Sequence, residues 1–108
     1  MIDPVSWRLA GGEVLREPRD GVTDYRGRLR LIDQTRLPGE LVYVESADTE
    51  EIFSFIQRLV VRGAPAIGCA AALGLAAVMY HSAVADEETF RALAERTAAR
   101  LAESRPTA

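Results

Sequence analysis

The chain has 108 residues, of which 48% are hydrophobic and 27% charged, so its length and composition suit one small domain with a buried core. Its net charge is −3 without blocks of like charge, which argues against a nucleic-acid-binding surface. One cysteine excludes an intramolecular disulfide and a thiolate metal cluster. Because the first residues also lack the apolar segment of a secretory signal, we expect a cytoplasmic protein, and we expect it to need no metal or other cofactor.

Residues 1–28 form the least regular part of the predicted fold. Gly11-Gly12 and Pro18 interrupt the first twenty residues, and few apolar side chains there are available for burial. We therefore expect an irregular segment over residues 1–20, followed by a lead-in to the first strand.

Residues 29–46 predict antiparallel strands. Leu29 and Leu31 alternate with polar residues, and a second β-compatible run follows at Leu41–Val44. Pro38-Gly39 between these runs is typical of a turn. A connection this short favours an antiparallel hairpin.

Residues 48–102 change to a helical period and predict a three-helix unit. Asp48 or Thr49 can cap the first helix, and acidic residues occupy its first turn. We expect this helix to end at Arg62-Gly63, because glycine readily takes the left-handed conformation that follows a helix.

The second helix is predicted from about Pro65 to Tyr80, since proline suits the first turn of a helix. This segment is apolar all round, so we expect it to lie centrally with the other two helices on either side. Its small residues Gly68, Ala72 and Gly74 would let neighbouring backbones approach closely.

The third helix is predicted to begin after Asp86, which is a suitable N-cap. Glu87 and Arg91 lie one turn apart and can form an ion pair. The last residues, Glu103–Ala108, predict the start of a further helix.

A membrane span is an alternative interpretation of Gly63–Ala85, which contains 23 residues and no charged side chain. Alanine and glycine dominate this segment, however, and His81 lies within it. Because few large aliphatic residues are present, a helix buried in protein is favoured over a membrane helix.

The beginning of the second helix is a candidate anion site. Arg62-Gly63-Ala64 directly precedes Pro65, so an arginine lies beside the unpaired N–H groups of a helix start. Arg105 before Pro106 repeats this arrangement, and two such arginines could bind one anion together. The alternative is a surface arginine beside a helix-ending glycine, which physical grounds alone favour.

Two further residues have ordinary structural interpretations. Cys69 has apolar neighbours, which predicts a buried and unreactive thiol. His81 follows the second helix far from its start, and we expect a helix-end histidine rather than an acid or base.

Three segments resemble methylthioribose-1-phosphate isomerase, a methionine-salvage family homologous to the regulatory subunits of the translation-initiation exchange factor eIF2B and to ribose-1,5-bisphosphate isomerase. They are VVRGAPAIGCAAALGLAA, LRLIDQTRLPGELVYVES and ESRPTA, and the resemblance covers Leu29 to Ala108. It implies an α+β fold, with a small antiparallel β unit followed by a helical bundle. In that family this unit is the amino-terminal domain, and a Rossmann-like carboxy-terminal domain, absent here, completes the enzyme.

The resemblance also implies which residues bind the substrate. Arg62, Gly63 and Ala64 match the family's first substrate-binding segment, and Arg105 matches a second substrate-contacting arginine. The catalytic residues are expected beyond residue 108. The implied reaction converts 5-methylthioribose 1-phosphate to 5-methylthioribulose 1-phosphate, and we expect the 108-residue chain to be inactive alone.

The implied partners are the sugar phosphate, the carboxy-terminal domain and, by analogy only, a second copy in a homodimer. Neither a nucleic acid nor a membrane is expected as a partner. The alternative function is a non-catalytic regulatory or interaction module of the initiation-factor branch, which would bind a ligand without converting it.

Overall fold

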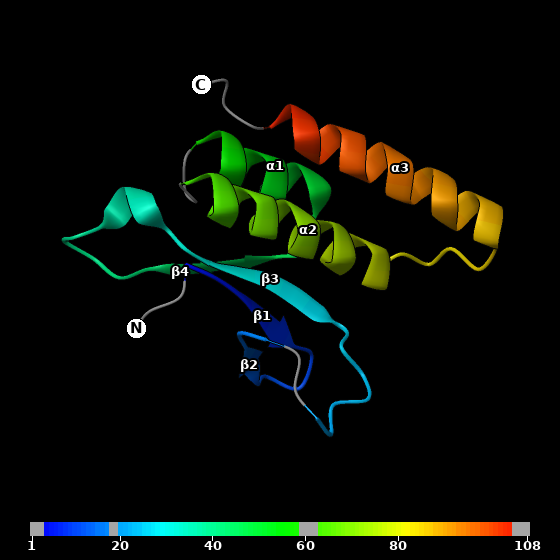
Figure 1. The fold of residues 1–108 in the computed structure, drawn as a ribbon, viewed down its shortest axis with the longest axis horizontal. Coiled ribbons are helices and arrows are strands. Elements are labelled where there is room, and N and C mark those ends of the chain that lie inside the picture. Colours follow the sequence, from blue (N-terminus) through cyan, green and yellow to red (C-terminus); the bar gives the residue numbers. More distant parts are fainter. Residues whose placement is uncertain (1–3, 18–19, 59–62, 105–108) are drawn as a thin grey trace.

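The computed structural model describes residues 4–17, 20–58 and 63–104. Within them, an antiparallel sheet comes first in the chain and three helices follow, so the predicted α+β fold is confirmed (Figure 1). The helices cover one face of the sheet. In chain order the elements are β1 (Val5–Leu9), β2 (Val14–Leu15), β3 (Gly27–Ile32), the short 3₁₀ helix η1 (Gln34–Arg36), β4 (Tyr43–Ser46), α1 (Thr49–Gln57), α2 (Ala64–Tyr80) and α3 (Glu87–Glu103).

The four strands lie in the order β2-β1-β3-β4, and every neighbouring pair is antiparallel. The predicted hairpin is confirmed, since Leu29 pairs with Ser46 and Ile32 with Tyr43. The expectation of an irregular beginning was wrong, because β1 and β2 lie within it. β1 pairs along its whole length with β3, and this long-range pairing stabilises a strand that local propensity alone does not indicate.

The core lies between the sheet and the helices. Its buried side chains come from β3 and all three helices: Leu29, Leu31, Ile52, Phe55, Ile56, Ala70 and Leu101. Gly74 of α2 packs directly on Ile52, since a Cβ at Gly74 would lie 3.0 Å from Ile52 Cγ2. The expected close approach is therefore correct for Gly74, whereas no atom lies within 4 Å of the corresponding position at Gly68, and Ala72 is exposed.

Aspartate side chains cap two of the helices, as predicted. Asp48 accepts a hydrogen bond from the Glu51 N–H at 2.9 Å, and Asp86 accepts one from the Thr89 N–H at 3.0 Å. The hydrogen bonds from Thr89 hold the pKa of Asp86 below its usual value. α1 ends at Gln57, before the predicted end; the residues between, 59–62, lie outside the described part of the chain.

The expected central position of α2 is only partly correct. α2 packs against α1, α3, β3 and β1, but α1 and α3 also pack against each other, with Arg100 Nη2 2.7 Å from Glu50 Oε1. One side of α2 faces away from all of these elements, and Cys69 and Ala72 are exposed there. Among the described residues, none of the helices combines the length and the apolar character that crossing a bilayer requires.

Candidate functional site

α2 begins differently from the other two helices. Gly63 occupies its N-cap position with φ 89° and ψ 134°, a left-handed conformation that favours glycine. No side-chain hydrogen bond caps this helix end within the described residues, whereas aspartates cap α1 and α3. The first helical hydrogen bond joins the Ile67 N–H to the Gly63 carbonyl oxygen at 2.9 Å.

This helix start carries groups of the kind that can bind an anion. Ala64 and Ala66 carry N–H groups in the first turn, where helical bonding leaves donors unpaired, and Pro65 between them carries none. The positive end of the helix dipole lies at the same place. A glycine without a side chain allows a ligand to approach the backbone, so the geometry suits phosphate oxygens.

The two arginines of the predicted site, Arg62 and Arg105, lie outside the described residues, so their convergence stays a prediction. α2 and α3 run antiparallel, and Figure 1 shows the end of α3 at the same end of the pair as the beginning of α2. Ser104, the last described residue, is buried there, and its hydroxyl donates to the Leu101 carbonyl oxygen. Gly63 and Ser104 thus belong to the same end of the helical unit.

The two residues given structural interpretations have different outcomes. Cys69 is exposed, so the expectation of a buried thiol was wrong; the residue lies on the side of α2 that no described element covers. His81 does lie at the end of α2, as predicted, and its Nε2 is 3.0 Å from the Gly27 carbonyl oxygen. It is about 25 Å from the helix start along the axis, too far to act there.

A charged cluster crosses three strands on the sheet face opposite the helices. Glu45 Oε2 lies 2.7 Å from Arg8 Nε and 3.1 Å from Arg30 Nη1. Burial raises the pKa of Glu45, but the hydrogen bonds and positive charges of Arg8 and Arg30 lower it by more. The pKa of Glu45 therefore lies below its usual value. Glu45 also lines a pocket of about 240 Å³ together with Arg28 and His81. The cluster therefore joins β1, β3 and β4 electrostatically.

Replacing Glu45 by glutamine is expected to reduce the free energy of unfolding by about 1 kcal/mol at neutral pH, because the two hydrogen bonds from Arg8 and Arg30 lose the negative charge of their acceptor. A lowered folded-state pKa stabilises the fold above the ordinary glutamate pKa of about 4.3, and this contribution disappears as the pH falls through the lower folded value. Urea unfolding of both proteins between pH 3 and pH 7 measures the difference.

Glu40→Gln is the matched control, since the Glu40 carboxylate forms an exposed and longer pair, 3.6 Å from Arg36 Nη1. A pH-independent effect of Glu45→Gln would contradict the assigned electrostatic role.

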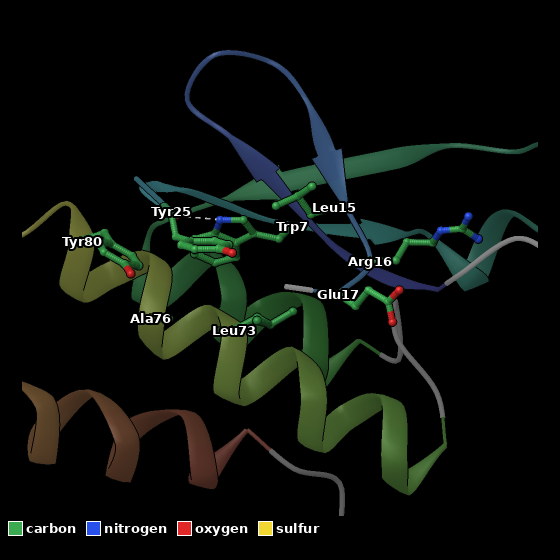
Figure 2. Close-up of a pocket in the computed structure, with 8 residues that line it drawn as sticks. All are labelled: Trp7, Leu15, Arg16, Glu17, Tyr25, Leu73, Ala76 and Tyr80. Carbon is green, nitrogen blue, oxygen red and sulfur yellow. Dashed lines mark hydrogen bonds between the residues drawn. The ribbon is translucent and has the colours of Figure 1, made fainter. Parts of the chain in front are cut away.

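A second, apolar pocket of about 270 Å³ lies between α2 and the amino-terminal strands (Figure 2). The sequence did not indicate this pocket, because five of its lining residues fall within residues 1–28, which were expected to be irregular or a lead-in to a strand: Trp7, Leu15, Arg16, Glu17 and Tyr25. The alternation of Val5, Trp7 and Leu9 is the sequence signal that could have indicated the strand and its inward face.

No group of histidine, cysteine, aspartate or glutamate side chains arranged to hold a metal ion occurs within residues 4–17, 20–58 and 63–104. Among the described residues, the candidate anion site consists of the backbone N–H groups at the start of α2.

Comparison with known proteins identifies relatives among sugar-phosphate isomerases. The chain is 44% identical over 107 residues to a 5-deoxyribose 1-phosphate isomerase of Moorella thermoacetica, covering 99% of this chain and 26% of the relative. It is 49% identical over 82 residues to a methylthioribose-1-phosphate isomerase of Desulfitobacterium hafniense, covering 74% and 23%. No family model matches the chain.

The fold is shared with solved structures, among them an isomerase and an initiation-factor subunit. A 5-methylthioribose 1-phosphate isomerase of Pyrococcus horikoshii aligns with a TM-score of 0.71 and 34% identity, over 85% of this chain and 26% of that one. The translation initiation factor eIF-2B subunit delta of A. fulgidus aligns with a TM-score of 0.68 and 40% identity, over 73% and 23%.

The chain spans about a quarter of the length of the curated relatives that it matches. Over that span, the relatives found by sequence and the solved structures found by fold include the same kind of isomerase. Over the segment that it covers, the chain is therefore homologous to the methylthioribose-1-phosphate isomerases and to an eIF-2B subunit.

Proposed function

We propose that the chain is the amino-terminal substrate-binding part of an aldose–ketose isomerase that acts on a pentose 1-phosphate. The observation that carries this proposal is the start of α2, where Gly63 has a left-handed φ of 89° and no described side chain caps the helix. Relatives named for 5-methylthioribose and 5-deoxyribose 1-phosphates support this substrate class. The product from the methylthio substrate is 5-methylthioribulose 1-phosphate.

In this proposal the chain binds the phosphate and does not perform the proton transfer. Isomerisation must open the sugar ring and move hydrogen between carbons one and two, which requires an acid or base beside those carbons. The N–H groups of α2, together with Arg62 and Arg105, would hold the phosphate and so fix the sugar beside groups supplied by another part of the protein. The 108-residue chain alone is expected to show no turnover.

Replacing Arg62 by alanine in the complete protein encoded by the gene is expected to lower kcat/KM for methylthioribose 1-phosphate by about 10²- to 10³-fold, because a fixed charged donor to the phosphate is lost. Arg58→Ala is the matched control, since Arg58 follows the last residue of α1, its side chain is exposed, and its backbone N–H bond to α1 survives the substitution. A spectrophotometric assay of ketose formation measures both. An unchanged rate in Arg62→Ala would remove this residue from the site, and turnover by the 108-residue chain would contradict the division of roles.

A regulatory module is the second candidate, favoured by the 40% identity to the eIF-2B subunit delta of A. fulgidus. Such a module would bind a sugar phosphate or nucleotide, or pair with a partner domain, without chemistry. Saturable binding of methylthioribose 1-phosphate by the complete protein, with no ketose formed, would favour this function over the isomerase.

A further inference from the structure

The apolar pocket between the amino-terminal strands and α2 has features of a ligand site that are independent of the phosphate site. Figure 2 shows side chains entering it from both sides, with Trp7 and Leu15 from the strands and Leu73, Ala76 and Tyr80 from α2. Its volume of about 270 Å³ lies just below the usual range of small-molecule sites, which begins at about 300 Å³. It therefore suits an occupant about the size of one ring system.

Aromatic side chains gather at one end of this pocket. The ring centroids of Trp7 and Tyr80 lie 6.1 Å apart with planes tilted by 57°, and the Trp7 indole N–H donates to the Tyr25 carbonyl oxygen at 2.8 Å. Because the indole N–H is already hydrogen-bonded, the Trp7 ring contributes apolar surface to the pocket and needs no hydrogen-bond acceptor from a ligand. Trp7 is 7% exposed and lies at the bottom of the pocket, whereas Tyr80 is 47% exposed and lies at its opening.

The opposite end of the pocket carries Arg16 and Glu17, which Figure 2 shows away from the aromatic group. The formal charges of Arg16 and Glu17 cancel, so this end of the pocket favours neither an anion nor a cation. An occupant that matches both ends is a neutral molecule with a ring at the aromatic end and a polar group toward the charged end.

The pocket is separate from the start of α2. Leu73 follows Gly63 by ten residues and Tyr80 by seventeen, which places the pocket about 15 to 25 Å along the helix from the proposed phosphate site. A pentose phosphate bound at Gly63 cannot reach its aromatic end. A ligand bound in the pocket would therefore be a molecule other than the sugar phosphate.

We propose that this pocket binds a small neutral molecule that carries one aromatic or heteroaromatic ring and a hydroxyl or amide group. Ring-on-ring packing favours such a molecule over an aliphatic one of equal size, because aromatic pairs gain more than their buried area alone provides. The preference is expected to be about three- to tenfold in Kd.

Benzyl alcohol and its aliphatic counterpart cyclohexylmethanol are the matched probes. Trp7 is the only tryptophan, so its indole N–H gives one resolved ¹H–¹⁵N NMR signal inside the pocket. Benzyl alcohol is expected to shift this signal saturably, with a Kd on the order of millimolar for so small a ligand, and cyclohexylmethanol is expected to bind about three- to tenfold more weakly. No saturable shift, or equal binding of the two alcohols, would overturn the proposal.

Ala76→Phe is expected to fill the pocket and abolish binding of benzyl alcohol, whereas Ala72→Phe, on the exposed side of the same helix, should leave it unchanged. If Ala76→Phe fails to fold, Tyr80→Leu decides, since it should weaken benzyl alcohol binding about threefold without changing the affinity for cyclohexylmethanol. Binding that is insensitive to these pocket variants would contradict the assigned site. A Trp7 signal that moves with protein concentration alone would identify a second copy as the occupant and likewise overturn the proposal.

Discussion

Replacing Gly27 by alanine is expected to reduce the free energy of unfolding by about 3 kcal/mol, because the added methyl group has no space. An ideal Cβ at this position would overlap the Arg8 carbonyl oxygen and lie 2.9 Å from the Arg8 carbonyl carbon and 2.8 Å from Trp7 Nε1. These neighbours are strand backbone and a buried side chain, which cannot move without disturbing the pairing of β1 with β3. Urea unfolding followed by circular dichroism measures the loss.

Gly11→Ala is the matched control for Gly27→Ala. No atom lies within 4 Å of a Cβ at Gly11, and its φ does not require glycine. We expect its free energy of unfolding to stay within about 0.5 kcal/mol of the parent value. Equal effects of the two substitutions would show that the close contact at Gly27 is not present.

Replacing Ile52 by alanine is expected to cost about 2 to 5 kcal/mol, because a fully buried side chain is removed and a cavity remains between α1 and α2. Ile52 is 0% exposed and touches Gly74 across the helix pair. Leu41→Ala is the control, since Leu41 is 50% exposed. Chemical unfolding of both variants tests the difference, and a cost for Ile52→Ala below that of Leu41→Ala would contradict the assigned core.

A double substitution tests the same contact from the other side. In the parent, alanine at Gly74 must displace Ile52, whose Cγ2 and Cδ1 atoms lie 3.0 and 3.2 Å from the added Cβ. In the Ile52→Ala background the space is open, and Gly74→Ala should stabilise the helix by up to about 1 kcal/mol through helix propensity. The effect of Gly74→Ala on the free energy of unfolding should therefore differ between the parent and the Ile52→Ala background. Equal effects in the two backgrounds would mean that Ile52 and Gly74 do not touch.

The helices and the β3–β4 hairpin could be predicted from the sequence because their signals are local. Asp48 and Asp86 are recognisable caps, and the turn residues at Pro38-Gly39 separate two apolar runs. β1 could not be predicted in the same way, since its strand conformation depends on pairing with residues about twenty positions later. The alternation of Val5, Trp7 and Leu9 is short, and the Gly11-Gly12 pair and Pro18 that follow favour an irregular segment.

Burial of α2 residues was harder to predict than the helix itself. An apolar composition indicates that a helix contacts protein, but it does not say on how many sides. Cys69 was expected to be buried on the basis of its neighbours, yet the sheet, α1 and α3 leave its side of the helix uncovered. Gly63 and Ala64 of the candidate site lie at a helix start, as expected, while their contact with a substrate and the positions of Arg62 and Arg105 remain predictions.

The exposure of Cys69 has a practical consequence. It is the only thiol of the chain, and it lies on α2 between the proposed phosphate site and the apolar pocket. A maleimide dye would therefore attach at one defined point without any engineered substitution. Energy transfer from Trp7, the only indole, to that dye would report how this helix moves relative to the sheet.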